Sequence, residues 1–346
     1  MHVKESNTKS IRNKYLFWIF SVAALLLILI SALLLSLTMG EIDISVFDLP
    51  KYIGKQGDSV IYSIMNKIRL PRTLLGLAVG GSLSLSGVIL QGIYRNPLVE
   101  PYTLGISGGG ALGVSIIIVF GLHRVIGSFM MPLAGFAGAL LTIFLVYSLS
   151  LRNGKIQIQN MLLIGVMISF IVSSAMMLLM AITTAENLQG IIFWMMGSLD
   201  ETNTLLIHVT LWVSVMGLGL AYLFAQPLNA LRLGEIKAKH LGINTEITIR
   251  ILFVLASLIT GMCVAIAGVI GFVGLIIPHM MRLIVGTDYR ILLISSFLGG
   301  GAFLIFSDLV ARTIIAPNEL PIGVITGIIG GTVFVVVLSR TRMKLL

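Results

Sequence analysis

Apolar runs long enough to cross a bilayer recur along almost the whole of this chain. They fall at roughly 15–38, 72–93, 103–122, 126–149, 158–182, 204–225, 248–268, 290–312 and 320–339. A helix needs about 20 apolar residues to cross the hydrocarbon core. A further run, 269–286, is interrupted by Gly271, Gly274 and Pro278, so we expect it to be short or partly non-helical. The pattern predicts an all-α polytopic membrane protein with about ten transmembrane helices.

The composition excludes a soluble domain of this length. The 346 residues are 57% hydrophobic and only 11% charged, with a mean hydropathy of +1.04. The net charge of +9 does not indicate a nucleic-acid partner, because the basic residues stand singly or in small clusters between apolar runs. Cys263 is the single cysteine, so neither a disulfide framework nor a thiolate metal site is expected. The five histidines show no ligand spacing, and we expect no metal or cofactor.

The distribution of basic residues predicts the orientation in the membrane. With a cytoplasmic N-terminus, most of the 23 lysines and arginines fall in inner segments, and most acidic residues fall outside. The first run is too long for the apolar core of a signal peptide, so we interpret it as a retained helix. An even number of crossings then places both termini in the cytoplasm, together with the loop 227–247.

A shift of the sequence by 181 positions indicates an internal repeat. It aligns Arg69 with Arg250, Gly80 with Gly261, 87–89 with 268–270, Pro97 with Pro278, and Gly105 with Gly286. The two copies, about 69–165 and about 250–346, would have opposite orientations, a plan common among transporters. Chance matching of Gly, Val and Ile is the alternative. We treat 1–346 as one transmembrane domain.

The motifs argue against an enzyme. The run GISGGG at 105–110 lacks the Lys and Ser/Thr of a nucleotide-binding loop, so the chain is not expected to hydrolyse ATP itself. No Ser/His/Asp arrangement lies on one side of the membrane. An ion-coupled secondary transporter is the alternative class, but such carriers keep ionisable residues at mid-membrane. Here Asp308, one turn before Arg312, is the main exception. The energy for transport is therefore expected from another subunit.

The most polar segment of the chain, 231–243, indicates a cytoplasmic partner. Leu233, Ile236 and Leu241 are expected near one face of a short helix, with charged residues on the other face. Gly242 is well placed to end that helix as its C′ residue. A solvated loop would not need the apolar residues, so we predict a docking surface.

Long ordered motifs resemble the FecCD-type permeases, the membrane subunits of ABC importers for iron–siderophores, haem and cobalamin. They are RLPRTLLGLAVGGSLSLSGVILQGIYRNPLVEPYTLGISGGGALG (69–113), LGEIKAKHLGI (233–243), GFVGLIIPHMMRLIVGTDYR (271–290), SDLVAR (307–312) and ELPIGVITGIIGG (319–331). The resemblance implies a multi-pass protein of a bacterial or archaeal cytoplasmic (inner) membrane. Its implied partners are a second permease subunit, two ATPase subunits, an extracytoplasmic binding protein and membrane lipid. Ferric siderophore is the preferred cargo, with cobalamin or another corrinoid and haem as alternatives, and a homodimer is preferred to a heterodimer.

The same resemblance assigns roles to three groups of residues. The ATPase-coupling loop would use Leu233, Gly234, Glu235, Ile236, Ala238, Leu241 and Gly242. The binding protein would dock through its glutamates on Arg69, Arg72 and Arg312, which are expected at the outer rim. The cytoplasmic gate would be Gln157, Ile158, Gln159 and Asn160. The alternatives are that the arginines reach lipid headgroups, with Arg312 held by Asp308, and that 157–160 is an ordinary helix entry.

Overall fold

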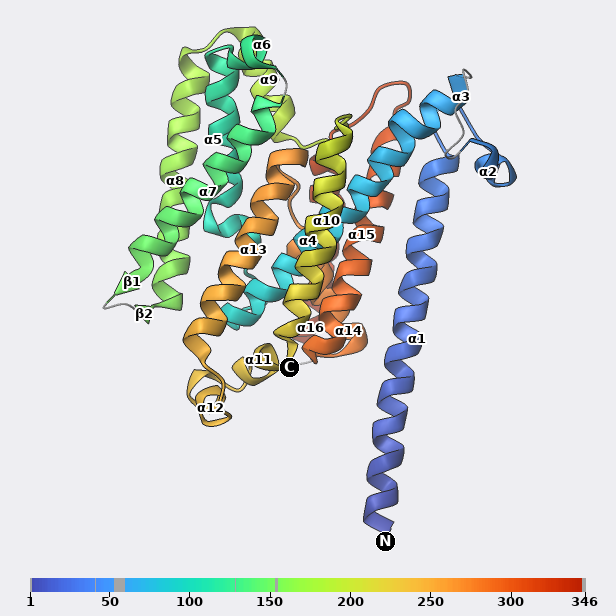
Figure 1. Cartoon of the computed structure of the whole chain (residues 1–346), viewed down its shortest axis with the longest axis vertical. Helices are drawn as coiled ribbons and strands as arrows, with labels where there is room; N and C mark the ends of the chain where they lie inside the picture. Colours follow the sequence, from blue (N-terminus) through green and yellow to red (C-terminus); the bar gives the residue numbers. More distant parts are fainter. Residues whose placement is uncertain (1, 41, 53–59, 128, 153–154, 344–346) are drawn as a thin grey trace.

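The computed structural model describes residues 2–40, 42–52, 60–127, 129–152 and 155–343 as a bundle of helices (Figure 1). Within these ranges, seven helical segments are long and apolar enough to cross a membrane. They contain α1 (His2–Thr38), α4 (Leu70–Tyr94), α7 (Met130–Ser150), α8 (Ile158–Ile182), α10 (Thr204–Leu223), α13 (Thr245–Ala267) and α15 (Tyr289–Thr313). Three further apolar helices are α5 (Ile106–Val119), α14 (Val273–Val285) and α16 (Ile322–Met343).

The all-α prediction is confirmed, and short elements that the sequence pattern missed join the long helices. They are η1 (Val46–Asp48), α2 (Leu49–Tyr52), α3 (Val60–Ser63), the π-helical η2 (Ile64–Arg69), η3 (Pro101–Leu104), α6 (Leu122–Ile126), α9 (Ala185–Met195), α11 (Ala225–Leu231) and α12 (Glu235–His240). A two-residue antiparallel ladder pairs β1 (Leu151–Arg152) with β2 (Lys155–Ile156). The interrupted run 269–286 is indeed short, because α14 has 13 residues and follows a non-helical segment.

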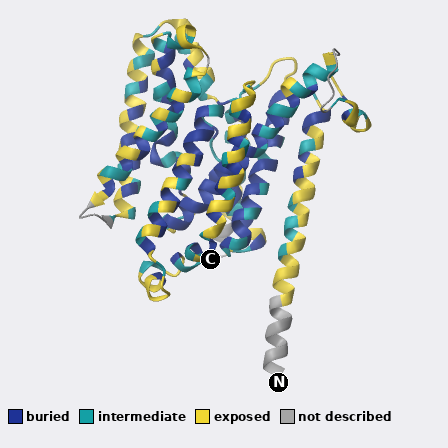
Figure 2. Ribbon diagram, in the orientation of Figure 1, coloured by how far each residue is buried: buried dark blue, intermediate teal, exposed yellow. Residues whose placement is uncertain are grey.

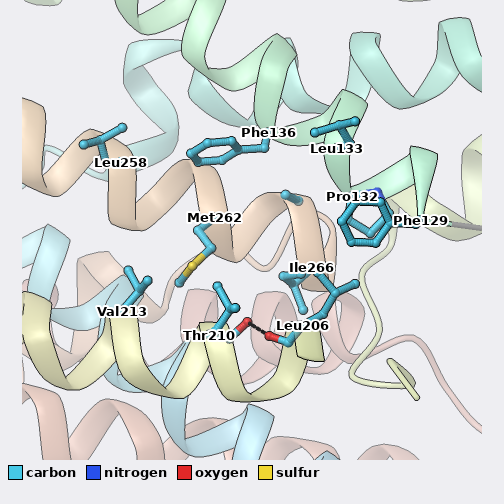
Figure 3. Close-up of a pocket in the computed structure, with 12 residues that line it drawn as sticks. Phe129, Pro132, Leu133, Phe136, Leu206, Thr210, Val213, Leu258, Met262 and Ile266 are labelled. Carbon is cyan, nitrogen blue, oxygen red and sulfur yellow. Dashed lines mark hydrogen bonds between the residues drawn. The ribbon is translucent and has the colours of Figure 1, made fainter. Parts of the chain in front are cut away.

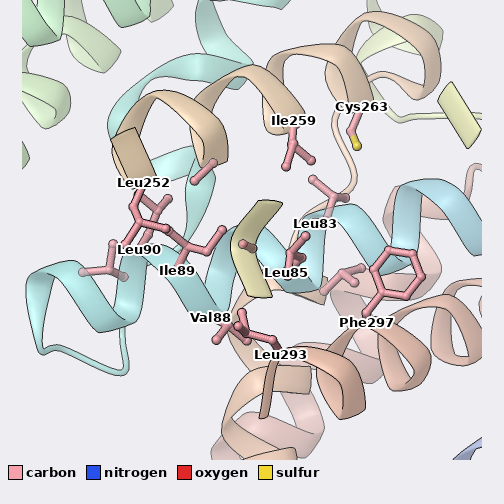
Figure 4. Packing of buried hydrophobic residues seen from close by; sticks show 14 of the residues in the cluster. Leu83, Leu85, Val88, Ile89, Leu90, Leu252, Ile259, Cys263, Leu293 and Phe297 are labelled. Carbon is pink, nitrogen blue, oxygen red and sulfur yellow. The ribbon is translucent and has the colours of Figure 1, made fainter. Parts of the chain in front are cut away.

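Helix α4 is the centre of the bundle. It is buried over most of its length, whereas α1 exposes most of its apolar side chains (Figure 2). Side chains from α13 and α15 converge on α4, as Leu252 does beside Leu90 and Leu293 beside Val88 (Figure 4). Glycine allows close approach: a Cβ added at Gly80 would overlap the carbonyl of Gly300 on α15. Small residues on α4 therefore let the bundle close around it.

The first and last described helices both have their chain-terminal ends toward one end of the molecule (Figure 1). Figure 1 shows α1 beginning and α16 ending toward the same end of the molecule as α12. We call this end the inner end and the opposite one the outer end. The terminal residues 1 and 344–346, for which a cytoplasmic position is predicted, lie outside the described residues.

The predicted repeat agrees with the helices over only part of its length. Helices α4 and α13 run in opposite directions (Figure 1), as copies of inverted orientation should. Beyond them the constant offset of 181 does not pair equivalent positions. Pro97 follows the end of α4, whereas Pro278 lies inside α14. Likewise Gly105 precedes α5, whereas Gly286 follows α14. The inverted repeat stays a prediction, and its copies would need insertions to align.

Candidate functional site

The polar segment 231–243 forms a short helix at the inner end, with the predicted termination. Helix α12 ends in a Schellman motif, in which Ile243 N donates to Ala238 O at 3.1 Å and Gly242 N donates to Lys239 O at 2.9 Å. Gly242 has a φ of +83°, which is left-handed and suits glycine. The prediction that Gly242 is the C′ residue is therefore confirmed, as is the short helix.

The expected separation of apolar and charged faces on this helix stays a prediction. Ala238 is the buried residue of α12, and the exposed side carries Ile236 together with Lys237 and Lys239. A helix of six residues packed through one alanine leaves both its apolar and its basic side chains exposed to solvent. Leu233, Ile236 and Leu241 remain 57%, 74% and 63% exposed. Glu235 is half-buried in the first turn, and Gly234, with φ +103°, precedes it.

Helix α11 and the start of α15 hold this surface in place. Asn229 on α11 donates to Asp288 Oδ1 at 3.0 Å and accepts from Tyr289 N at 3.1 Å. Arg232 donates to the carbonyl of Thr287 at 2.7 Å. Arg290 and then Asn229 hold the pKa of the Asp288 carboxyl well below its usual range, because both donate to the charged form. Asp288 therefore stays ionised as the anchor under α11.

The predicted gate residues lie where α8 begins, next to the β1–β2 ladder. Gln157 precedes the helix, and its side-chain carbonyl accepts a hydrogen bond from the Asn160 amide. Gln157, Gln159 and Asn160 are exposed, whereas Ile158 is half-buried. The four residues form an exposed amide-rich turn, which fits either a gate or an ordinary helix entry.

At the outer end, Arg69 is buried rather than displayed. It donates from Nη1 to the carbonyls of Leu37 and Thr38 at 2.8 and 3.1 Å, and from Nη2 to that of Ile42 at 2.5 Å. Its exposed fraction is 4%. This arginine ties the π-helical start of the α4 segment to the end of α1.

Arg72 and Arg312 share the carboxylate of Asp308, which is 1% exposed. Arg72 Nε donates to Asp308 Oδ1 at 2.7 Å, and Arg312 Nε donates to Oδ2 at 3.0 Å. Arg72 Nη1 also contacts Asp200 Oδ1 at 2.6 Å and Glu319 Oε2 at 2.7 Å. This outer ion network thus joins α4, α15 and the loops around 200 and 319. The interaction between Arg312 and Asp308 was expected, whereas the other two carboxylates were not.

The expectation of three arginines exposed at an outer rim is therefore wrong. Their guanidinium groups make hydrogen bonds or ion pairs within the chain, because a buried charge must be paired or hydrogen-bonded. The exposed members of the network are Asp200 and Glu319, with side chains 60% and 47% exposed. Arg69 and Arg312 still line a cavity of about 180 Å³, so both can be reached from outside through it.

A groove between α7, α10 and α13 has no side chains suited to catalysis or to binding a polar ligand (Figure 3). It has a volume of about 380 Å³ and is lined by apolar side chains apart from Thr210. The Thr210 hydroxyl donates to Leu206 O at 2.7 Å, so it is already satisfied. Its helices are candidate membrane spans, and hydrocarbon suits such a lining.

Comparison with known proteins is consistent with this arrangement. Residues 26–340 match the FecCD transport family. The chain is 39% identical over 283 residues to the cobalamin import system permease protein BtuC of Halobacterium salinarum, covering 82% of this chain and 75% of that one. It is 37% identical over 322 residues to the hemin transport system permease protein HmuU of Yersinia pestis, covering 92% and 95%. A solved metal-chelate type ABC transporter in an inward-facing conformation superposes with a TM-score of 0.82 at 33% identity, covering 92% and 98%.

Proposed function

Because this chain belongs to the FecCD transport family, we propose that it is the membrane subunit through which a bulky metal chelate is imported. The chain is a permease of the ABC importer type in the cytoplasmic membrane and works with ATPase and substrate-binding proteins. It performs no hydrolysis itself in this proposal. Its part is to provide the pathway and to change conformation when an ATPase partner binds and hydrolyses ATP.

The observation that carries the proposal is the exposed apolar surface of α12. Leu233, Ile236 and Leu241 stand in water on the cytoplasmic side of the predicted topology, where exposed aliphatic side chains have no lipid to meet. A groove on an ATPase subunit would bury them, and the basic residues beside them would add attraction to an acidic partner surface. The Schellman turn ends α12, and the hydrogen bonds of Asn229 attach the preceding α11 to the start of α15.

The cargo belongs to one chemical class. Two relatives are named for cobalamin and hemin, and both are large metal-containing macrocycles. Ferric siderophore, the cargo preferred from the sequence, is also a bulky metal chelate. We propose that the cargo is a bulky metal chelate. The uptake measurement below identifies which chelate it is. A second copy of this chain is proposed to complete the pathway.

The first experiment reconstitutes the chain in vesicles, alone and with its ATPase and binding protein. We expect no accumulation by the chain alone under a proton or sodium gradient, because its apolar runs carry almost no ionisable residues that could couple transport to an ion. With the full set of partners and MgATP, one of cyanocobalamin, haemin or a ferric hydroxamate should accumulate. Omitting the binding protein should remove most of that uptake. Gradient-driven uptake by the chain alone would contradict the proposal, as would failure of all three cargoes with the complete complex.

The outer end is proposed as the docking face for the binding protein. Arg69 and Arg312 would meet acidic side chains that enter the cavity of about 180 Å³ beside them. Arg72 would serve less directly, by holding Asp200 and Glu319 at the edge of this face. Exposed ion pairs at such an edge contribute at most about 1 kcal/mol each, so docking would depend on several contacts.

The amide turn 157–160 is proposed as the cytoplasmic gate. Gln159 and Asn160 are exposed at the start of α8 and would face the same residues of the second copy. Cysteines introduced singly at Gln159 or Asn160 should crosslink across the dimer to an extent that changes when ATP binds. The native Cys263 is buried and should not interfere. As a control, cysteine at Phe170, exposed further along α8, should respond less. Crosslinking at 159 and 160 that ignores nucleotide would remove the gate.

A further inference from the structure

Two segments without α-helix meet inside the bundle, the first of them containing the 3₁₀ turn η3, and each precedes one of the short α-helices. Residues 95–105 lie between α4 and α5, and residues 268–272 lie between α13 and α14. Helices α5 and α14 have 14 and 13 residues, which is roughly 20 Å and too short to cross the hydrocarbon core. Irregular backbone at such a depth is tolerated only where the protein satisfies its polar groups.

Side chains of the first segment satisfy the backbone of the second. Glu100 Oε1 accepts a hydrogen bond from Phe272 N at 2.6 Å, and Tyr102 Oη accepts one from Ile270 N at 3.2 Å. Glu100 has no ion-pair partner among the described residues. Its carboxylate instead faces the positive end of the α14 dipole, at the residue that caps that helix.

Phe272 is held in a conformation that it would not adopt freely. Its φ is +69°, which is left-handed and disfavoured for a bulky residue. The Phe272 carbonyl nevertheless starts α14 by accepting from Leu275 N and Ile276 N at 3.1 and 2.9 Å. A strained capping residue persists only when its surroundings hold it, and the Glu100 carboxylate is positioned to do so.

The same residue fixes α14 against α16. A Cβ added at Gly330 on α16 would lie only 2.7 Å from Phe272 Cβ, so the two backbones are closely apposed here. Further along, the rings of His279 and Phe334 meet edge to face with centroids 6.2 Å apart. Any change in the backbone at Phe272 would therefore shift α14 relative to α16.

We propose that Glu100 is a positioning residue, which keeps Phe272 left-handed and thereby sets the resting arrangement of α14 and α16 in the permease. The essential feature is an acceptor that reaches Phe272 N, and a neutral carbonyl oxygen can supply it. The experiment that tests this role uses neither cargo nor ATPase. A negative result would therefore not contradict the proposed ATPase docking surface, and loss of that docking surface would not contradict the role of Glu100.

Spin labels on the full-length chain in nanodiscs test this assignment. Leu283 on α14 and Val335 on α16 are 62% and 66% exposed and can carry the pair of labels. We expect one dominant distance in the unsubstituted chain and in Glu100→Gln. Glu100→Leu should lower the population of that distance by roughly tenfold relative to other distances, because it leaves the part-buried Phe272 N–H without its acceptor. Should Glu100→Leu not fold, Glu100→Ser, which is polar but too short to reach, takes its place.

Two controls separate positioning from general destabilisation. Labels at Leu141 on α7 and Leu220 on α10, both exposed, should report no change in any variant. Tyr102→Phe also removes a side-chain acceptor from the 268–272 backbone, but at Ile270, whose φ is not left-handed. It should leave the α14–α16 distance nearly intact. The proposal is overturned if Glu100→Leu or Glu100→Ser preserves the distance, if Glu100→Gln disperses it, or if Tyr102→Phe disperses it equally.

Discussion

Ile236→Asp on α12 should abolish ATP-driven uptake while the protein still inserts and folds. The side chain is 74% exposed, so the folded state loses almost nothing when it is replaced. A buried partner surface would instead have to accept an unpaired carboxylate in place of an aliphatic contact. Central interface residues of this kind contribute about 2 kcal/mol or more, so ATPase affinity should fall by roughly 30-fold or more. Co-purification with the ATPase and uptake in vesicles measure the two effects.

The matched control for this substitution is Asn244→Asp. Asn244 is exposed and caps α13 by accepting from Ile247 N, and an aspartate can keep that hydrogen bond. The control adds the same charge to the same loop without removing an apolar side chain. It should retain ATPase binding within a few-fold. Wild-type binding and uptake by Ile236→Asp would show that the ATPase docks elsewhere.

Asp308→Asn should cause the largest loss of stability among conservative changes in this chain. Asp308 is the carboxylate that Arg72 and Arg312 share, and Arg312 has no second carboxylate among the described residues. An amide of the same shape leaves that guanidinium buried beside a second one without compensating charge. Breaking a buried ion pair in this way costs about 3–5 kcal/mol. Thermal unfolding in detergent can be monitored by the loss of the monodisperse peak in size-exclusion chromatography. The midpoint for Asp308→Asn should be clearly lower than that of the unsubstituted chain.

Glu319→Gln provides the comparison, because it removes a carboxylate from the same network at an exposed position. Its side chain is 47% exposed, so water can replace the lost interaction and the cost should be at most about 1 kcal/mol. Equal midpoints for Asp308→Asn and Glu319→Gln would mean that burial does not govern this network.

The outer arginines illustrate where reasoning from sequence stopped. Their placement at the outer ends of helices followed from the orientation that most basic residues set, although outer arginines run against the positive-inside rule. The i,i+4 spacing of Asp308 and Arg312 indicated a local pair. Nothing in the pattern indicated that Asp200 and Glu319, more than a hundred residues from Arg72, would complete the network. Long-range ion pairs depend on how loops fold back over helix ends. The hydrophobic periodicity of a sequence carries no information about such contacts.

The sequence by itself determined the features that depend on local composition. Apolar runs specified the membrane helices, Gly242 specified the end of α12, and the interrupted run 269–286 specified a short helix, because solvent preference and backbone freedom act on each residue where it stands. Only the tertiary structure decided what contacts what. Glu100 lies in the motif 69–113, which the sequence analysis used only for the family resemblance. Its hydrogen bond to Phe272 depends on the contact between two segments far apart in the sequence, which only the structure shows. The burial of Arg69, Arg72 and Arg312 was decided in the same way, since a guanidinium becomes buried only when distant carbonyls and carboxylates surround it.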